Sequence, residues 1–275
     1  MRVAKTVMQL FFSFVLCLPA GIASAAADAK VWERWTEYDA ASIASVDHSA
    51  WQAFLDNNLK ISKDGVNRIA YAVVSPADRE LLDHYIITLS GESVSKRRRS
   101  EQLAYWINFY NALTVKVVLD NYPVPSILKI SSGVFSVGPW SKKRVEVEGE
   151  PLSLDDMEHR ILRPIWKDPR IHYAVNCASI GCPNLRPTAY SPSELDATLT
   201  LAAREYINSQ RGVKTTNGKL LVSSIYEWFS DDFGGTDEHV IAHLKQYADA
   251  HLANQLSTFT AISDDFYDWG LNEPL

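Results

Sequence analysis

The sequence predicts a helix-rich α+β domain built around a small, mainly antiparallel sheet. Several stretches carry apolar residues at the three- and four-residue spacing of a helix, and the strongest runs from Glu101 to Asn121. Other stretches alternate apolar and polar residues or flank a two-residue turn such as Asn217-Gly218, which is typical of antiparallel strands. No Pro-, Gly- or Ser-rich linker divides the 275 residues, so we expect a single domain over 26–275.

The first 25 residues have the order of a secretory signal peptide. Arg2 and Lys5 precede an apolar segment over 7–18, and the small residues Ala23-Ser24-Ala25 follow it. The apolar segment is shorter than the roughly 20 residues that span a bilayer. We therefore expect an exported protein, periplasmic or extracellular, with no transmembrane segment in the mature chain.

The charge of the chain argues against nucleic-acid binding. The chain has 27 Lys and Arg against 33 Asp and Glu, a net charge of -6. Loss of Arg2 and Lys5 with the signal peptide would bring the net charge to about -8. Such a chain lacks the basic surface that binds a phosphate backbone, and nothing in the sequence identifies another partner.

The N-terminal half is predicted to be mostly helical. A weak helical pattern over 31–59 is followed by a clearer helix over 77–89, and Pro76 suits the first turn of that helix. Ser100 is placed to cap the long helix that begins at Glu101.

The long helix is apolar on most of its surface and carries Asn108 and Asn111 on the remaining face. We therefore expect it to be buried nearly all round, with both asparagine side chains hydrogen-bonded. They either hold a neighbouring loop in place or face a ligand.

The elements after the long helix follow from similar signals. We predict a strand over 145–148, a helix over 154–163 opened by Ser153 and Asp156, a strand over 171–175, a helix over 193–207, a hairpin over 213–222 and a last long helix beginning at Thr236. The tail over 265–272 mixes aromatic and acidic residues, and we expect it to pack back onto the domain.

The densest set of reactive side chains lies between Asp168 and Leu185. His172 falls within the predicted strand, and Cys177, Ser179 and Cys182 follow in a bend that contains Gly181. A loop fed by a strand end is a common place for catalytic and binding groups.

Several separated motifs occur in one order between residues 78 and 272. They are Glu101-Gln-Leu-Ala-Tyr-Trp-Ile-Asn-Phe-Tyr-Asn-Ala112, Glu158-His159 with Leu162-Arg163, Asp168-Pro-Arg-Ile-His-Tyr-Ala174, Cys177-Ala-Ser-Ile-Gly-Cys-Pro183, Trp228 with Asp232-Phe233, and Tyr267-Asp-Trp-Gly-Leu-Asn272. Together these motifs resemble the family catalogued as domain of unknown function 547, in an exported, bacterial-type form. The resemblance implies no activity and no cofactor, so the chemistry must be argued from the residues.

A cysteine with a histidine is the usual pattern of a thiol nucleophile. In a regular strand, His172 and Cys177 would lie about 16 Å apart on opposite faces, which excludes a direct pair and leaves His159 as a candidate base. In a transglutaminase- or papain-like fold, a strand histidine lies against the start of the central helix, where this chain has Glu101. Glu101 and His172 could thus form an acid–base pair, or a structural hydrogen bond that only orients the histidine.

The candidate residues follow from these arguments. The candidate catalytic residues are Glu101, His172 and Cys177. The candidate ligand-binding residues are Asn108, Glu158, His159, Arg170 and Ser179.

Cys177 and Cys182 remain after the signal peptide takes Cys17 with it. An even pair in an oxidising compartment, with four residues between the cysteines in a bend, predicts a disulfide. Zinc binding by His172 and the two cysteines lacks a fourth ligand. We therefore predict neither a metal nor a cofactor.

Two functions fit these observations, and the sequence does not decide whether the protein is an enzyme. One is a hydrolase- or transferase-like enzyme with a pocket between the Glu101 helix and the His172 strand. The other is a non-catalytic envelope or extracellular binding module in which the Cys177–Cys182 disulfide is structural. A cleft that contains Glu101, Asn108 and His172 would favour the enzyme, and a sealed hydrogen-bond network would favour the binding module.

The signal-peptide pattern predicts a mature chain that begins within a few residues of Ala26. Mass spectrometry of the protein recovered from the envelope or the medium measures this start directly. Retention of residues 1–20 would contradict the prediction.

Overall fold

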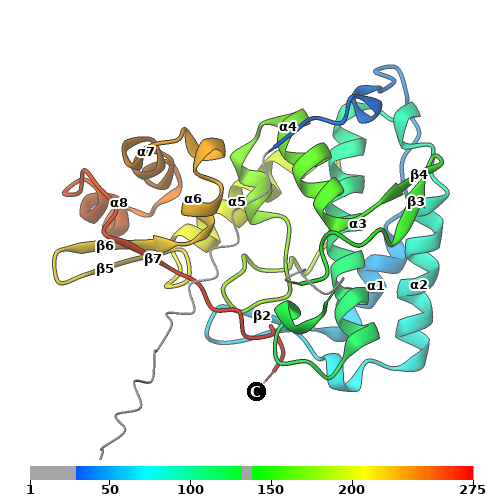
Figure 1. Cartoon of the computed structure of the whole chain (residues 1–275), viewed down its shortest axis with the longest axis horizontal. Coiled ribbons are helices and arrows are strands. Elements are labelled where there is room, and N and C mark those ends of the chain that lie inside the picture. Colours follow the sequence, from blue (N-terminus) through cyan, green and yellow to red (C-terminus); the bar gives the residue numbers. More distant parts are fainter. Residues whose placement is uncertain (1–28, 132–137, 275) are drawn as a thin grey trace, which may run out of the picture.

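The computed structural model describes residues 29–131 and 138–274 and confirms the α+β class (Figure 1). The strands form two antiparallel hairpins and one three-stranded sheet. In that sheet β5 (Val213–Thr216) pairs antiparallel with β6 (Lys219–Ser223), whereas β7 (Asp264–Phe266) pairs parallel with β6. The expected sheet is therefore divided into three small pieces, and one of them includes a parallel strand.

Among the described residues, the remaining elements are short apart from five helices of ten or more residues. They are η1 (Glu33–Thr36), α1 (Ser49–Asn58), β1 (Leu59–Ile61), β2 (Asn67–Ile69), η2 (Tyr71–Val73), α2 (Pro76–Ser90), η3 (Val94–Lys96), α3 (Arg99–Asn121), η4 (Ile127–Lys129), β3 (Val145–Val147), β4 (Glu150–Leu152), the π-helical turn η5 (Asp156–Leu162), α4 (Arg163–Trp166), η6 (Pro169–Tyr173), α5 (Leu195–Ile207), α6 (Ile225–Trp228), η7 (Ser230–Phe233), α7 (Asp237–Tyr247) and α8 (Ala250–Leu256).

The larger part of the structure packs around α3, with α2 against α3 and α1 against α2 (Figure 1). Of the 23 residues of α3, 18 are buried, which confirms the prediction of a helix buried nearly all round. The predicted cap is wrong, because α3 already begins at Arg99 and Ser100 lies inside its first turn. The Arg99 guanidinium instead donates to the backbone carbonyls of Trp35 and Thr36, which ties this end of α3 to the N-terminal segment.

The two buried asparagines of α3, Asn108 and Asn111, form paired hydrogen bonds with the backbone of loops. The Asn108 side chain donates to the Tyr190 carbonyl at 2.8 Å and accepts from the Tyr190 amide at 2.9 Å. Asn111 donates to the Ala174 carbonyl at 2.9 Å and accepts from the Asn176 amide at 2.8 Å. These bonds confirm that both side chains are hydrogen-bonded, and of the two roles left open they show the structural one.

A second cluster of buried side chains surrounds the three-stranded sheet and is formed by α5, α6, α7 and α8 (Figure 1). The hairpin β5–β6 turns at Asn217-Gly218 as predicted, and both residues have positive φ, 50° and 72°. Thr236 caps α7 through the His239 amide, also as predicted. The expected long helix is divided, because α7 ends at Tyr247 and Asp249 caps the separate helix α8.

The predicted strand over 171–175 is wrong, and this segment forms the 3-10 helix η6 and a turn. Pro169 sits in the first turn of η6, and the Asp168 side chain accepts from the Arg170 amide. The segment is apolar because it runs between the two clusters: Ile171 and Val175 belong to the larger one and Tyr173 to the smaller one. Burial from two sides gives the same continuous apolar run as a buried strand.

The predicted capping bonds of Ser153 and Asp156 and the predicted packing of the tail are both confirmed. The Ser153 hydroxyl accepts from the Asp156 amide, and the Asp156 carboxylate accepts from the Ser153 amide at 2.8 Å, so the reciprocal capping bonds are present. The helix that they open is wound as the π turn η5 rather than as a regular α-helix. The tail packs back, since the Leu271 and Asn272 amides donate to the Pro125 and Ala178 carbonyls.

The signal peptide predicted over residues 1–25 lies outside the described residues. Within the described ranges, no helix is long and apolar enough to cross a membrane.

Replacing Asn108 with Leu should destabilise the fold. The carbonyl and amide of Tyr190 would stay buried without partners, at a cost of about 1–3 kcal/mol each. Asn208 provides a matched control, because its exposed side chain makes the same paired bonds, to the Tyr247 carbonyl and the Asp249 amide. Chemical denaturation should show a large loss of unfolding free energy for Asn108→Leu and a much smaller one for Asn208→Leu. Equal losses would contradict the assignment.

Candidate functional site

Four polar side chains meet around the sulfur of Cys177. The Cys177 Sγ lies 2.9 Å from the Cys182 Sγ, 3.2 Å from the Ser179 Oγ and 3.0 Å from the Tyr267 hydroxyl. The Ser179 Oγ also lies 2.9 Å from the Tyr267 hydroxyl oxygen. We call Cys177, Ser179, Cys182 and Tyr267 the thiol cluster. Cys177 is partly exposed, whereas Cys182 is buried.

The loop that carries the thiol cluster is fixed by bonds to backbone groups. Asn176 opens it, and its side chain accepts from the Ala178 amide at 2.9 Å, which holds Ala178 at a φ of 59°. The Ile180 and Gly181 amides donate to carbonyls of the C-terminal tail at 2.8 Å each. A side chain at 181 would meet the Asp268 amide nitrogen at 2.8 Å, so Gly181 allows the tail and Tyr267 to approach the thiols.

Hydrogen bonding divides the two thiols into an acidic one and a weakly acidic one. The hydrogen bond with Cys182 lowers the pKa of the Cys177 thiol against the effect of burial, and bonds with Ser179 and Tyr267 lower it further. Burial raises the pKa of Cys182, and its bond with Cys177 adds to this. The partly exposed Cys177 is therefore the thiol that loses its proton first as the pH rises, and Cys182 keeps its proton to higher pH.

Aromatic rings adjoin the thiol cluster. The Tyr267 ring packs against Trp228 and Trp269 with centroid distances of 4.8 and 4.7 Å, and Trp269 packs against Trp140 at 5.9 Å. All four of these residues are partly exposed. Apolar surface thus borders the sulfur on the side of Tyr267.

A second group of polar side chains lies around Phe229, the neighbour of Trp228. The Asp232 carboxylate accepts from His172 at 2.7 Å and from Arg163 at 2.6 Å, and the His172 ring stacks on Phe229 at 4.3 Å. Burial opposes ionisation of Asp232, but the bonds from His172 and Arg163 lower its pKa to about 2. We call His159, Arg163, His172 and Asp232 the ion cluster.

His159 joins the ion cluster through Arg163. The guanidinium lies 3.0 Å from the His159 Nδ1, and because arginine can only donate, this nitrogen accepts. Burial lowers the pKa of His159, so the ring is neutral with its proton on Nε2. The ion cluster thereby holds the π turn η5, which also carries Glu158.

Glu158 connects the two clusters. Its side chain is buried, and its charge acts on His159 on one side and on Cys177 and Tyr110 on the other. Burial raises the pKa of Tyr110, and the charge of Glu158 raises it further. Glu158 is therefore a buried acidic group whose charge acts on residues of both clusters.

The structure brings together only part of the predicted site. Cys177 and Ser179 lie in the thiol cluster, His159 and His172 lie in the ion cluster, and Glu158 lies between the clusters. The Asn108 side chain is hydrogen-bonded to the backbone of Tyr190, and Arg170 pairs with Asp168 and Asp196 on the surface. Cys177 and Cys182 are free thiols in the structure, and the disulfide between them stays a prediction.

Glu101 lies far from the thiol cluster. It accepts from the Val46 amide at 2.8 Å and lies 3.7 Å from Arg98. Ten residues of α3 separate it from Asn111, which contacts the thiol-bearing loop, and this corresponds to about 15 Å along the helix. The structure thus does not place Glu101, His172 and Cys177 in one site.

Tyr267 and Asp232 were not predicted as site residues. Both occur in the motifs that resemble the family, Tyr267 in the C-terminal motif and Asp232 beside Phe233, so the motifs contained the signal. Spacing along the chain does not reveal it, because Tyr267 lies 90 residues after Cys177 and Asp232 lies 60 residues after His172.

Neither cluster forms a metal site in the described part of the chain. No group of three or more His, Cys, Asp or Glu side chains is placed to hold a metal ion there. His172 in particular contacts Asp232 and Phe229 rather than the two cysteines.

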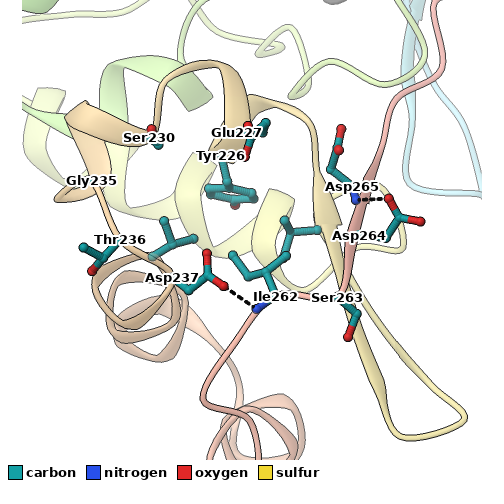
Figure 2. A pocket seen from close by; sticks show the side chains of 12 residues that line it. Tyr226, Glu227, Ser230, Gly235, Thr236, Asp237, Ile262, Ser263, Asp264 and Asp265 are labelled. Carbon is teal, nitrogen blue, oxygen red and sulfur yellow. Dashed lines mark hydrogen bonds between the residues drawn. The ribbon is translucent and has the colours of Figure 1, made fainter. Parts of the chain in front are cut away.

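Figure 2 shows a separate acidic pocket between α6, α7 and the segment before β7. Asp237 accepts from the Ile262 amide, and Asp264 accepts from the Asp265 amide. Glu227 adds a further carboxylate to the lining. The pocket contains none of the predicted site residues and no thiol, histidine or cation.

The fold and the two clusters define an α+β protein with a partly exposed cysteine whose sulfur is held by hydrogen bonds. Residues 94–207 match the sequence model of the family described as "Protein of unknown function, DUF547". The match supports the family resemblance of the motifs and covers α3, η5, the thiol-bearing loop and α5, but not Asp232 or Tyr267. Comparison with curated proteins and with solved structures gave no match.

Proposed function

We propose that this protein is a thiol-dependent enzyme of the hydrolase or transferase type, with Cys177 as its nucleophile. The observation that carries the proposal is the set of three hydrogen bonds around the sulfur of Cys177, a partly exposed residue. Bonds that stabilise a thiolate are the usual means of activating a cysteine near neutral pH. The proposed site lies on the loop after η6, not between the Glu101 helix and a strand.

The chemistry would be transfer of an acyl group. The Cys177 thiolate attacks the carbonyl carbon of an ester or amide, the bond to the alcohol or amine breaks, and a thioester forms. Water or another acceptor then attacks the thioester and releases Cys177. We assign the uptake of the acceptor's proton to Glu158, a buried acidic side chain whose charge acts on Cys177.

The aromatic rings suggest where a substrate binds. The Tyr267 hydroxyl contacts the sulfur, and Trp228 and Trp269 pack against the Tyr267 ring; these partly exposed rings suit an apolar or flat group next to the scissile bond. Action outside the cytoplasm belongs to the same proposal and rests on the N-terminal signal pattern.

The alternative is a non-catalytic binding module with a structural disulfide. The 2.9 Å separation of the two Sγ atoms favours this alternative as well, because a small movement would bring them within bonding distance. The two proposals differ in one respect: the enzyme needs a reducible, reactive Cys177, and the module needs a permanent bond.

Alkylation of the folded, reduced protein tests the proposed nucleophile. With limiting iodoacetamide, Cys177 should be modified at pH 7 well before Cys182, and the reaction rate should fall only at a pH below the usual cysteine range near 8.5. Tyr267→Phe removes one hydrogen bond to the sulfur and should move this profile to higher pH. Peptide mass spectrometry locates the label.

Incubation with p-nitrophenyl acetate tests the acyl transfer itself. The wild-type protein should release nitrophenol and carry an acetyl group on Cys177, and Cys177→Ser should carry none at that position. Equal labelling of both cysteines, or a folded protein without a reducible thiol, would contradict the enzyme. The second result would support the binding module.

A further inference from the structure

We propose that Cys177 and Cys182 form a dithiol pair that exchanges with disulfides, so that the protein has a thiol–disulfide exchange activity. The inference rests on the proposed function only in its use of Cys177 as the attacking sulfur. It requires no acyl chemistry, and its substrate class is a disulfide-bonded thiol compound or protein.

The two cysteines differ in exposure as the two steps of exchange require. The partly exposed Cys177 can meet a disulfide from outside, and the buried Cys182, 4 % exposed, can reach only Cys177. The Cys182 Sγ also accepts from the Cys177 amide at 2.9 Å. The buried sulfur thus already lies against the backbone of the residue whose sulfur it must attack. An exposed attacking sulfur and a buried resolving sulfur are the two parts of a dithiol exchange site.

Both ends of the loop are anchored, so exchange would involve only the sulfur atoms. Asn111 holds the Asn176 amide before Cys177. The Arg211 guanidinium donates to the Cys182 carbonyl at 2.6 Å and to the Asn184 side chain at 2.9 Å. The Sγ atoms need to approach from 2.9 Å to the bond length of about 2.05 Å, which a rotation of either side chain can supply.

The exchange needs no reagent other than the substrate disulfide. The Cys177 thiolate attacks one sulfur of the substrate disulfide, that disulfide breaks, and one substrate thiolate leaves. The Cys182 thiol then gives its proton to the departing thiolate or to solvent and attacks the Cys177 Sγ, and the second substrate thiolate leaves. The substrate disulfide gains two electrons, and the cysteine pair loses two as it becomes a disulfide.

Burial of Cys182 sets the order of the two steps. Because burial raises the pKa of this thiol, it keeps its proton while Cys177 is a thiolate, so the hydrogen bond between the sulfurs persists until the mixed disulfide forms. Tyr267 and Ser179 contact the Cys177 Sγ, so they stabilise the thiolate that attacks in the first step.

The experiment uses the reduced, folded full chain and the chromogenic disulfide dithiobis(nitrobenzoate). The wild-type protein should release two thionitrobenzoates per chain and end two hydrogens lighter with no adduct, and dithiothreitol should restore both thiols. Cys182→Ser should release one thionitrobenzoate and keep the other as a stable mixed disulfide on Cys177. Cys177→Ser should react much more slowly, because only the buried thiol remains.

Ser179→Ala serves as a second variant in case a cysteine substitution fails to fold. It should keep the release of two thionitrobenzoates but slow the first step at pH 7, since one hydrogen bond to the sulfur is lost. A stable adduct on the wild-type chain, or equal behaviour of wild type and Cys182→Ser, would overturn the exchange. Acetylation of Cys177 together with such a failure would leave the proposed function standing, and exchange without acetylation would leave only the inference standing.

Discussion

The side chain of Asn111 connects the buried helix α3 to the loop that carries the thiols. It donates to the Ala174 carbonyl and accepts from the Asn176 amide, while Asn108, one turn earlier on the helix, does the same for the backbone of Tyr190. Segments without a neighbouring strand would otherwise bury unpaired backbone groups, at about 1–3 kcal/mol each. The asparagine side chains therefore supply the hydrogen bonds that a neighbouring strand would supply. Those of Asn111 fix the backbone next to Cys177.

The position of the site follows from this anchoring. The segment 171–175 runs between the two hydrophobic clusters, with Ile171 in the larger cluster and Tyr173 in the smaller one. The loop after it receives Tyr267 from the C-terminal tail, and η7 brings Asp232 to His172. Residues from distant parts of the chain thus form the thiol cluster and the ion cluster, and the acidic pocket of Figure 2 shares no residue with either.

The sequence predicted elements that depend on local signals. The period of α3, the capping bonds of Ser153 and the Asn217-Gly218 turn all depend on neighbours within a few residues, and all are present. The strand over 171–175 was wrong because burial by two clusters gives the same apolar run as a strand. The pairing of Glu101 with His172 rested on the geometry of that strand, so it had no basis once the strand was absent. Tyr267 and Asp232 depend on tertiary contacts, which spacing does not encode.

The Asn176 amide is the most direct probe of the anchoring of the Cys177 loop by α3, because it donates to Asn111. Native-state hydrogen exchange of the Asn176 amide, which donates to Asn111, should be as slow as that of the most protected α3 amides and should depend on denaturant as global unfolding does. The Asp249 amide donates to the exposed Asn208 in the same way and should exchange much faster. Exchange at Asn176 as fast as at Asp249, and independent of denaturant, would show that α3 does not hold the loop of Cys177.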